Sequence, residues 1–126
     1  MGHRITITAG RISIEAELND SASAEAIRRA LPIQGEASTW GQEVYFEIGV
    51  EAPSAKDARE VMSVGDLAYW PPGRALCLFF GRTPASAADG RPRAASPVNP
   101  VGRILGEAKV LASIRDGQAI NVRAKT

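Results

Sequence analysis

The chain has 126 residues, of which 44% are hydrophobic and 23% charged, and its 15 basic and 14 acidic side chains leave a formal net charge of +1. These values are typical of one soluble globular domain over 1–126, and the dispersed charges argue against nucleic acid or an anionic membrane as a partner. The sequence shows neither a signal peptide nor the roughly 18 apolar residues of a membrane helix, and its single cysteine precludes an internal disulfide. We therefore expect a cytoplasmic protein.

The N-terminal third predicts a β-hairpin followed by a short helix. Apolar and polar residues alternate over 5–9 and again over 12–18, which is the pattern of half-buried strands, and Gly10 lies at the turn between them. Residues 19–21 (Asn-Asp-Ser) supply side chains that can cap the amino end of a helix. Pro32 ends this helix, because the residue before a proline avoids helical geometry.

The middle of the chain predicts three strands. Alternation over 40–48 indicates the first, whereas 54–62 predicts either a turn or two of helix or a polar loop. The segments 67–70 and 75–80 indicate two more strands, joined by a type II turn in which Gly73 supplies the positive φ. The continuous apolar character of 75–80 predicts a strand that is packed on both faces.

The last third begins with a break in this pattern. Four prolines and many small residues over 82–102 predict a mobile loop, with an ordered lid as the alternative. Strands over 103–111 and 118–124 follow, joined by a hairpin turn at 116–117. Seven or eight short strands predict an all-β fold with one or two short helices. A closed antiparallel eight-stranded β-barrel is favoured, because closure removes unprotected edges.

Four sequence blocks carry a resemblance to a known family: Ala30-Leu31-Pro32-Ile33, Trp40-Gly41-Gln42-Glu43-Val44-Tyr45-Phe46, Gly65-Asp66-Leu67-Ala68-Tyr69-Trp70-Pro71-Pro72-Gly73 and Phe79-Phe80-Gly81-Arg82-Thr83-Pro84. In these blocks the chain resembles the small bacterial and archaeal cyclophilin-like proteins that lack the true cyclophilin signature. The resemblance implies a closed barrel capped by a helix, with a cleft on the barrel face where true cyclophilins hold proline peptides. The Phe-His-Arg motif that carries the catalytic arginine of true cyclophilins does not occur in this sequence.

Aromatic side chains gather in the same part of the chain. Residues 65–84 hold two of the three Phe, one of the two Trp and one of the two Tyr. Clustered aromatic rings build either a core or the wall of a cleft. We therefore expect a cleft that binds a small molecule or an extended peptide. The residues expected near its walls are Trp40, Glu43, Tyr45, Tyr69, Phe79, Phe80, Arg82 and Thr83. Since Tyr69 and Trp70 point to opposite faces, one of them fills the barrel and the other faces the cleft or solvent.

The sequence leaves several activities open and assigns no catalytic residue. Glu43 and Glu47 flank Tyr45 on one strand face, on which successive side chains lie about 7 Å apart. Two carboxylates on one face can act as acid and base, but a solvated strand face is the favoured interpretation. Peptidyl-prolyl isomerisation is the enzymatic alternative by fold analogy, with Arg74 or Arg82 replacing the missing arginine. A third alternative is an accessory subunit or domain of a larger amide-hydrolysing enzyme, in which related barrels occur; a homo-oligomer also stays open.

Metal and cofactor chemistry find no support in the sequence. The single histidine, His3, and the single cysteine, Cys77, lie far apart, so we expect no metal site and an inert core thiol. The glycines of 65–81 lack the Gly-Lys-Ser/Thr sequence of a phosphate loop, so no cofactor is expected. Asp66 follows Gly65 directly before a strand, where an aspartate usually holds a turn through backbone amides rather than acting in catalysis.

Overall fold

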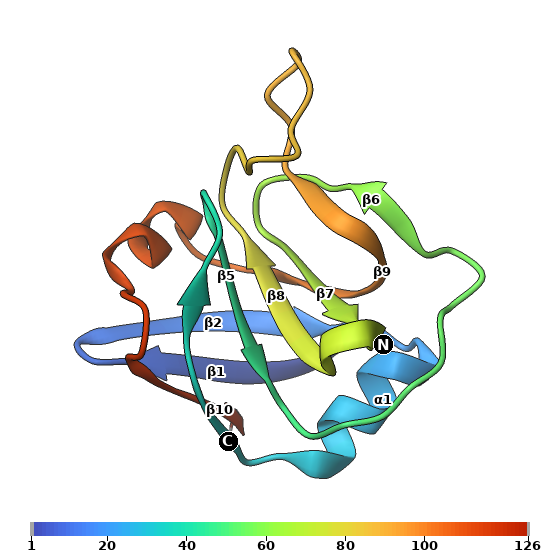
Figure 1. Cartoon of the computed structure of the whole chain (residues 1–126). Coiled ribbons are helices and arrows are strands. Elements are labelled where there is room, and N and C mark those ends of the chain that lie inside the picture. Colours follow the sequence, from blue (N-terminus) through green and yellow to red (C-terminus); the bar gives the residue numbers. More distant parts are fainter. Residues whose placement is uncertain (1, 126) are drawn as a thin grey trace.

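One antiparallel sheet dominates the computed structural model, which describes residues 2–125 (Figure 1). Within these residues there are ten strands, one α-helix and two short 3₁₀ helices. The strands are β1 (His3–Ala9), β2 (Ile12–Leu18), β3 (Ile33–Glu36), β4 (Ser38–Thr39), β5 (Glu43–Glu47), β6 (Arg59–Val61), β7 (Asp66–Trp70), β8 (Ala75–Phe79), β9 (Arg93–Ile104) and β10 (Ala119–Ala124). The helices are α1 (Ala22–Ala30) and the 3₁₀ helices Pro71–Gly73 and Ala108–Ser113. The expected all-β fold with short helices is confirmed.

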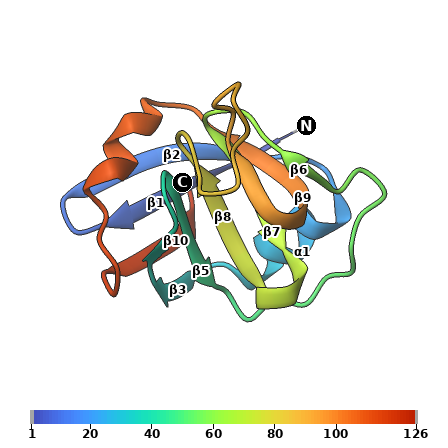
Figure 2. The ribbon, with the colours of Figure 1, turned by 45° about the horizontal axis from the view of Figure 1, so that its top comes forward.

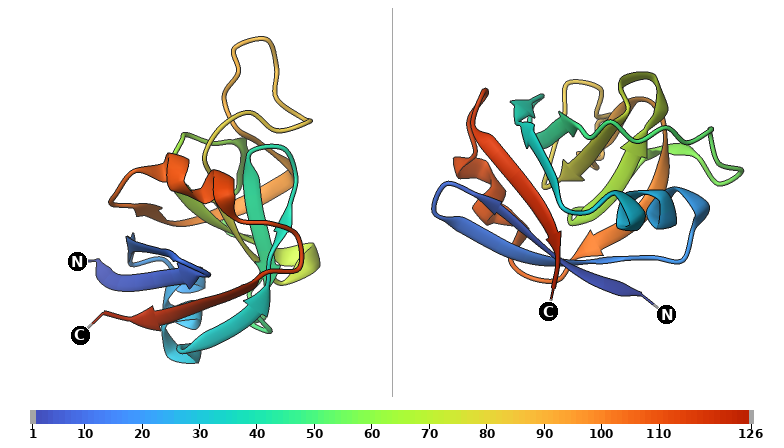
Figure 3. Two further views of the ribbon diagram at one scale, coloured as in Figure 1. Left: turned by 90° about the vertical axis from the view of Figure 1, so that its left-hand side faces the viewer. Right: turned by 90° about the horizontal axis from the view of Figure 1, so that it is seen from below.

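The sheet is curled, and the two strands at its opposite ends are consecutive in the sequence. The strand order is β3-β10-β1-β2-β9-β7-β8-β5-β4, with β6 paired to β9 outside this path. Its end strands β3 and β4 are separated only by Ala37, so the backbone itself runs from one end of the sheet to the other (Figure 3). Among the strands of residues 2–125 the hydrogen-bonded path remains open between these two ends. The closure of the expected eight-stranded barrel therefore stays a prediction.

The N-terminal elements form as the sequence predicts. Strand β1 pairs with β2 in a register that places Ala9 opposite Ile12, which leaves a two-residue turn. Gly10 occupies this turn with φ of 58°, a conformation that glycine adopts without strain. Ser21 caps α1 by accepting a hydrogen bond of 3.2 Å from the Ala24 amide. This short helix brings one apolar face against the curled sheet.

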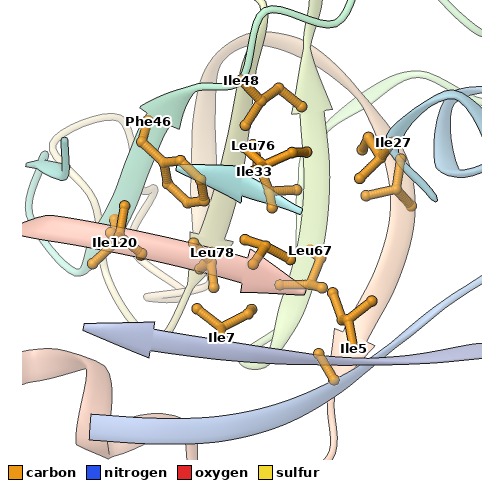
Figure 4. Packing of buried hydrophobic residues seen from close by; sticks show 14 of the residues in the cluster. Ile5, Ile7, Ile27, Ile33, Phe46, Ile48, Leu67, Leu76, Leu78 and Ile120 are labelled. Atoms are coloured by element: carbon orange, nitrogen blue, oxygen red, sulfur yellow. The ribbon is translucent and has the colours of Figure 1, made fainter. Parts of the chain in front are cut away.

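The main core lies on the inner face of the sheet. Alternate residues of the strands point inward and are almost fully buried, and Ile27 of α1 joins them (Figure 4). Figure 4 shows the side chains of both halves of the sheet meeting there: Ile5, Ile7, Ile33, Phe46, Ile48, Leu67, Leu76, Leu78 and Ile120. Because all five residues of β8 are buried, the prediction that this strand is packed on both faces is confirmed. The inner face of the sheet is thus covered by a continuous cluster of buried side chains.

The prediction of a loop over 82–102 is wrong for its second half. Residues 93–102 belong to β9, which pairs with β6, β7 and β2 in turn. The prolines are tolerated because the ladders are irregular there: the pairing of β7 with β9 shifts register between Leu67 and Ala68, opposite Pro100 and Gly102. Only 82–92 form a connection without strand structure, which projects from the sheet between β8 and β9 (Figure 1).

The predicted strand over 103–111 is also wrong beyond residue 104. Residues 108–113 form a 3₁₀ helix, and Ala108, Leu111 and Ile114 are buried at a spacing of three. This spacing matches the three residues per turn of a 3₁₀ helix rather than the period of a strand. The predicted hairpin at 116–117 is therefore wrong too, since β10 pairs with β1 and β3 instead of β9.

Two further local predictions need correction. Residues 54–62 form neither a helix nor a complete loop, because 59–61 are the short strand β6. The connection between β7 and β8 contains the 3₁₀ helix Pro71–Gly73, and Arg74, which follows it, takes the positive φ of 47°; the prediction of a type II turn with glycine in that role is therefore wrong. No helix in the described part of the chain combines the length and apolar character needed to cross a membrane.

Candidate functional site: an aromatic cleft on the outer face of the sheet

A second apolar cluster lies on the face of the sheet opposite the main core. Strands β9, β7, β8 and β5 are adjacent in the sheet, and β6 lies beside β9 (Figure 2). The side chains that point away from the main core on these strands form their own cluster: Met62, Ala68, Cys77, Phe79, Ala94 and Val98, with Tyr45 and Trp70 packed against it. Several side chains of this outer cluster also line a cleft.

The cleft has a volume of about 210 Å³. It is lined by Trp40, Glu43, Tyr45, Trp70, Cys77, Ala94, Ala95 and Val98. Three aromatic rings and three small aliphatic side chains make most of this surface apolar, and Glu43 is the one carboxylate among them. Sites for drug-sized ligands commonly have volumes of about 300–1,000 Å³, so this cleft is small by comparison. The cleft therefore suits one amino-acid side chain or a molecule of similar size.

Glu43 is the most unusual side chain of the cleft. It is only 5% exposed, and its carboxylate oxygen Oε1 is buried without a hydrogen-bond partner. Burial raises the pKa of Glu43 from 4.5 to about 7, while hydrogen bonding to the neighbouring Cys77 thiol acts weakly in the opposite direction. A carboxyl group in this state is close to half-protonated at neutral pH, so it can either donate or accept a hydrogen bond. The interpretation of Glu43 as part of a solvated strand face is wrong.

Cys77 lies beside Glu43, and its thiol is buried. It is buried and free of disulfide bonding, and burial raises its pKa well above the ordinary value, with the charge of Glu43 adding to the effect. A thiol that stays protonated is a poor nucleophile. Its expected place in the most apolar strand is confirmed, although its side chain also touches the cleft.

Trp70 is fixed at the cleft by its own hydrogen bond. Its indole Nε1–H donates to Ser96 Oγ over 2.7 Å. This hydrogen bond connects the last residue of β7 to the N-terminal part of β9. Tyr69, the preceding residue, points to the other face, where it is buried in the main core and its hydroxyl donates to the Val50 carbonyl oxygen. Of these two adjacent rings, one fills the interior of the sheet and the other lines the cleft, as the alternation predicts.

Two of the sequence blocks interlock at the edge of the cleft. The Gln42 amide donates to the Arg82 carbonyl over 2.8 Å, and the Phe80 amide donates to the Gln42 carbonyl over 2.9 Å. Gly81 leaves room for the Gln42 side chain, since a Cβ at this position would lie 2.0 Å from Gln42 Oε1 and would displace it. Gly41 adopts a φ of 62° in the same contact. These contacts hold the turn between β4 and β5, which contains Trp40 and leads into Glu43.

Three of the eight residues expected near the cleft line it, namely Trp40, Glu43 and Tyr45. Phe79 is fully buried in the outer cluster beneath the cleft. Tyr69 does not line the cleft, because its side chain is buried in the main core on the opposite face of the sheet.

The remaining three expected residues lie at the interlocked turn. Phe80 is half-buried against the main core. Arg82 donates from its guanidinium to the Ala87 carbonyl oxygen over 3.1 Å, and the buried Thr83 hydroxyl donates to the Arg93 carbonyl oxygen over 2.5 Å. These contacts give Arg82 and Thr83 a part in holding the 82–92 connection, and neither side chain lines the cleft.

Sequence reasoning missed the wall that β9 contributes. Ala94, Ala95 and Val98 line the cleft, but they lie in the segment that was predicted to be a loop. The weak alternation of Ala94, Ser96 and Val98 was the only local signal, and the neighbouring prolines outweighed it. Asp66 has the structural role that was expected, since its carboxylate accepts a 2.8 Å hydrogen bond from the Ser63 amide.

No group of three or more His, Cys, Asp or Glu side chains able to hold a metal ion occurs among residues 2–125. The cleft contains one carboxylate and one thiol, which are too few ligands for a typical protein-bound zinc ion. Its lining consists of aromatic faces, small aliphatic side chains, one thiol and one buried carboxyl group.

The comparisons with known proteins agree with this architecture. A family model described as Cyclophilin-like matches residues 3–123. The chain belongs to the Cyclophilin-like family. The solution structure of a hypothetical protein from Archaeoglobus fulgidus is similar over 98% of this chain and 95% of that chain, with 36% identity and a TM-score of 0.81. No curated protein matches the sequence. The resemblance predicted from the four sequence blocks is therefore confirmed, and this Cyclophilin-like chain shares its fold with an archaeal protein.

Proposed function

We propose that this protein binds a small molecule, or a single side chain of an extended peptide, in the cleft on the outer face of the sheet. The observation that carries the proposal is the buried carboxyl group of Glu43, whose Oε1 has no partner within an otherwise apolar cleft. Burying such a group costs stability unless something compensates it, and a ligand that contacts it would do so. Apolar pockets with one or two polar groups are the usual form of small-molecule sites.

The two tryptophans offer a direct test of binding. The sequence contains two Trp residues, Trp40 and Trp70, and both line the cleft, so intrinsic tryptophan fluorescence reports on this site alone. We expect members of a fragment set that contains neutral, cationic and anionic compounds to change this fluorescence and to shift the two indole N–H resonances in NMR spectra. Binding should weaken in Glu43→Gln and persist in Glu47→Gln, since Glu47 is exposed on the same strand. If no fragment and no short peptide shifts either indole resonance, the proposal is refuted.

Peptidyl-prolyl isomerisation stays an alternative prediction with less support from the site. Of the arginines considered for it, Arg74 pairs with Glu51 over 2.6 Å and Arg82 contacts Ala87, so neither lines the cleft. A protease-coupled assay with a proline peptide tests it, with Arg74→Ala and Arg82→Ala as controls. A role within a larger amide-hydrolysing enzyme also stays a prediction, which copurification from the native host would test.

A further inference from the structure

The cleft combines three features that together select a class of ligand. Its rings come from Trp40, Tyr45 and Trp70, on the β4–β5 turn and on two different strands. Its carboxyl group, on Glu43, is buried beside them. No basic side chain is found among the described residues that line it. Aromatic faces attract cations, and a carboxylate attracts them more strongly still.

The missing counter-charge is the decisive point. Elsewhere in the described structure, carboxylates with close ion pairs lie near the surface, as Glu25 does with Arg28 and Glu60 with Arg93. Glu43 is more deeply buried than these groups, yet Oε1 has neither an ion-pair nor a hydrogen-bond partner. A buried carboxylate usually has a cation or several donors beside it. Apart from hydrogen bonding to the Cys77 thiol, the carboxyl group of Glu43 is therefore left without a complement among the described residues of the cleft.

We infer that the cleft recognises a small organic cation with N–H donors, such as an alkylammonium, amidinium or guanidinium group, either free or at the end of a peptide side chain. This inference rests on the proposed function, because it names the ligand class of the same cleft. The N–H donors satisfy the carboxylate, and the rings of Trp40, Tyr45 and Trp70 contact the remaining surface of the cation. The small volume limits the occupant to one such group with a short apolar stem.

Binding of a cation should depend on pH through Glu43. The other titratable groups that line the cleft are the Tyr45 hydroxyl from β5 and the Cys77 thiol from β8, while Trp40 of the β4–β5 turn, Trp70 of β7 and the β9 side chains carry no titratable group. Since burial raises the pKa of Glu43 to about 7, a growing fraction of the free protein is protonated below that pH. The apparent affinity for a cation falls with the ionised fraction, so the dissociation constant should rise about tenfold from pH 8 to pH 6.

The test compares matched ligands that differ only in charge. Benzamidinium and benzamide have nearly the same shape, and the tripeptides Gly-Arg-Gly and Gly-citrulline-Gly form the corresponding peptide pair. Tryptophan fluorescence and indole N–H shifts measure their dissociation constants at pH 6, 7 and 8. We expect the cation of each bound pair to bind at least tenfold more tightly at pH 8, with the advantage lost in Glu43→Gln and kept in Glu47→Gln. Binding of benzamidinium but not of the arginine peptide would identify a free cation as the ligand.

Three results would overturn the inference. The first is that the neutral compound of a pair binds as tightly as the cation or more tightly, or that the affinity for the cation falls as the pH rises. The cleft would then bind uncharged hydrogen-bond donors, and the proposed function would stand. The second is equal loss of binding in Glu47→Gln, which would place the cation elsewhere. The third is the absence of binding by both cations at millimolar concentration. In that case the wider fragment screen decides the proposed function separately, because it also contains neutral and anionic compounds.

Discussion

The buried carboxyl group of Glu43 makes a quantitative prediction about stability. Its pKa is raised to about 7 in the folded protein, whereas 4.5 is the ordinary value that applies in the unfolded chain. Between these values the folded protein keeps a proton that the unfolded chain has lost. Stability that is fully present below pH 4.5 is therefore lost as the pH rises through 7. Each pKa unit is worth about 1.4 kcal/mol, so Glu43 should cost the protein about 2–3 kcal/mol between pH 5 and pH 8.

Glu43→Gln removes this titration and keeps the size of the side chain. We expect the free energy of unfolding of Glu43→Gln, relative to that of the wild-type protein, to increase by about 2–3 kcal/mol from pH 5 to pH 8. In a domain of this size the corresponding change in melting temperature is on the order of 10 °C. Urea unfolding followed by far-UV circular dichroism at pH 5, 6, 7 and 8 measures the difference. Contributions from all other groups cancel, because both proteins contain them.

Glu47→Gln is the matched control, since this exposed residue lies on the same strand and its profile should stay parallel to the wild type. Parallel profiles for Glu43→Gln and the wild type would refute the reasoning. Should Glu43→Gln fail to fold, the carboxyl ¹³C resonance of Glu43 in the wild-type protein gives the same answer. A midpoint near 4.5 for that resonance would show that burial does not hold the proton on Glu43.

Three further predictions concern the packing around the sheet. Gly102→Ala should destabilise the protein by at least 1–3 kcal/mol, because a Cβ there would lie 2.1 Å from a backbone oxygen of β2, whereas Gly106→Ala, with 3.6 Å to its nearest neighbour, should be tolerated in the same urea experiment. Asn99→Ala should lower the free energy of unfolding by about 2–4 kcal/mol, as measured by thermal unfolding. The buried amide of Asn99 donates two hydrogen bonds and accepts one, and these connect α1 and the 53–55 segment to β9. A loss below about 0.5 kcal/mol would contradict this role. Cys77 should react with a disulfide reagent about a hundredfold more slowly in the native protein than in urea, and equal rates would show that its burial is incomplete.

Where the sequence pattern is regular, local physics decides the structure. The alternation of β1 and β2, the cap at Ser21 and the apolar run of β8 each need only neighbouring residues to specify an element, and all three form as predicted. The alternation of Tyr69 and Trp70 likewise places two rings on opposite faces of one strand. Such features follow from the chemistry of adjacent residues, so a single sequence contains them.

The failures have a common physical cause. Strand β9 contains Pro97 and Pro100, which remove backbone donors and which local reasoning therefore assigns to a loop. In the folded protein Pro100 lies at the irregular step of the β7–β9 ladder and Pro97 in the irregular part of the β6–β9 pairing, where a missing donor is tolerated. The 3₁₀ helix over 108–113 is a similar case. Its apolar residues, three positions apart, favour this helix because they pack against the main core, which comes from distant parts of the sequence. Tertiary packing overrides the local preference in both segments.

The sequence by itself determined the type of the fold, its N-terminal elements and three of the residues that line the cleft, because these depend on the periodicity of side chains and on recognisable blocks. The tertiary structure decided which face each block uses and what surrounds it. Glu43 looks like a solvent-facing residue in an alternating strand, but in the folded protein it is buried in a cleft that side chains of β7, β8 and β9 also line. Burial depends on contacts between segments that are distant in the sequence, so no local pattern could have predicted a carboxyl group that titrates near neutrality.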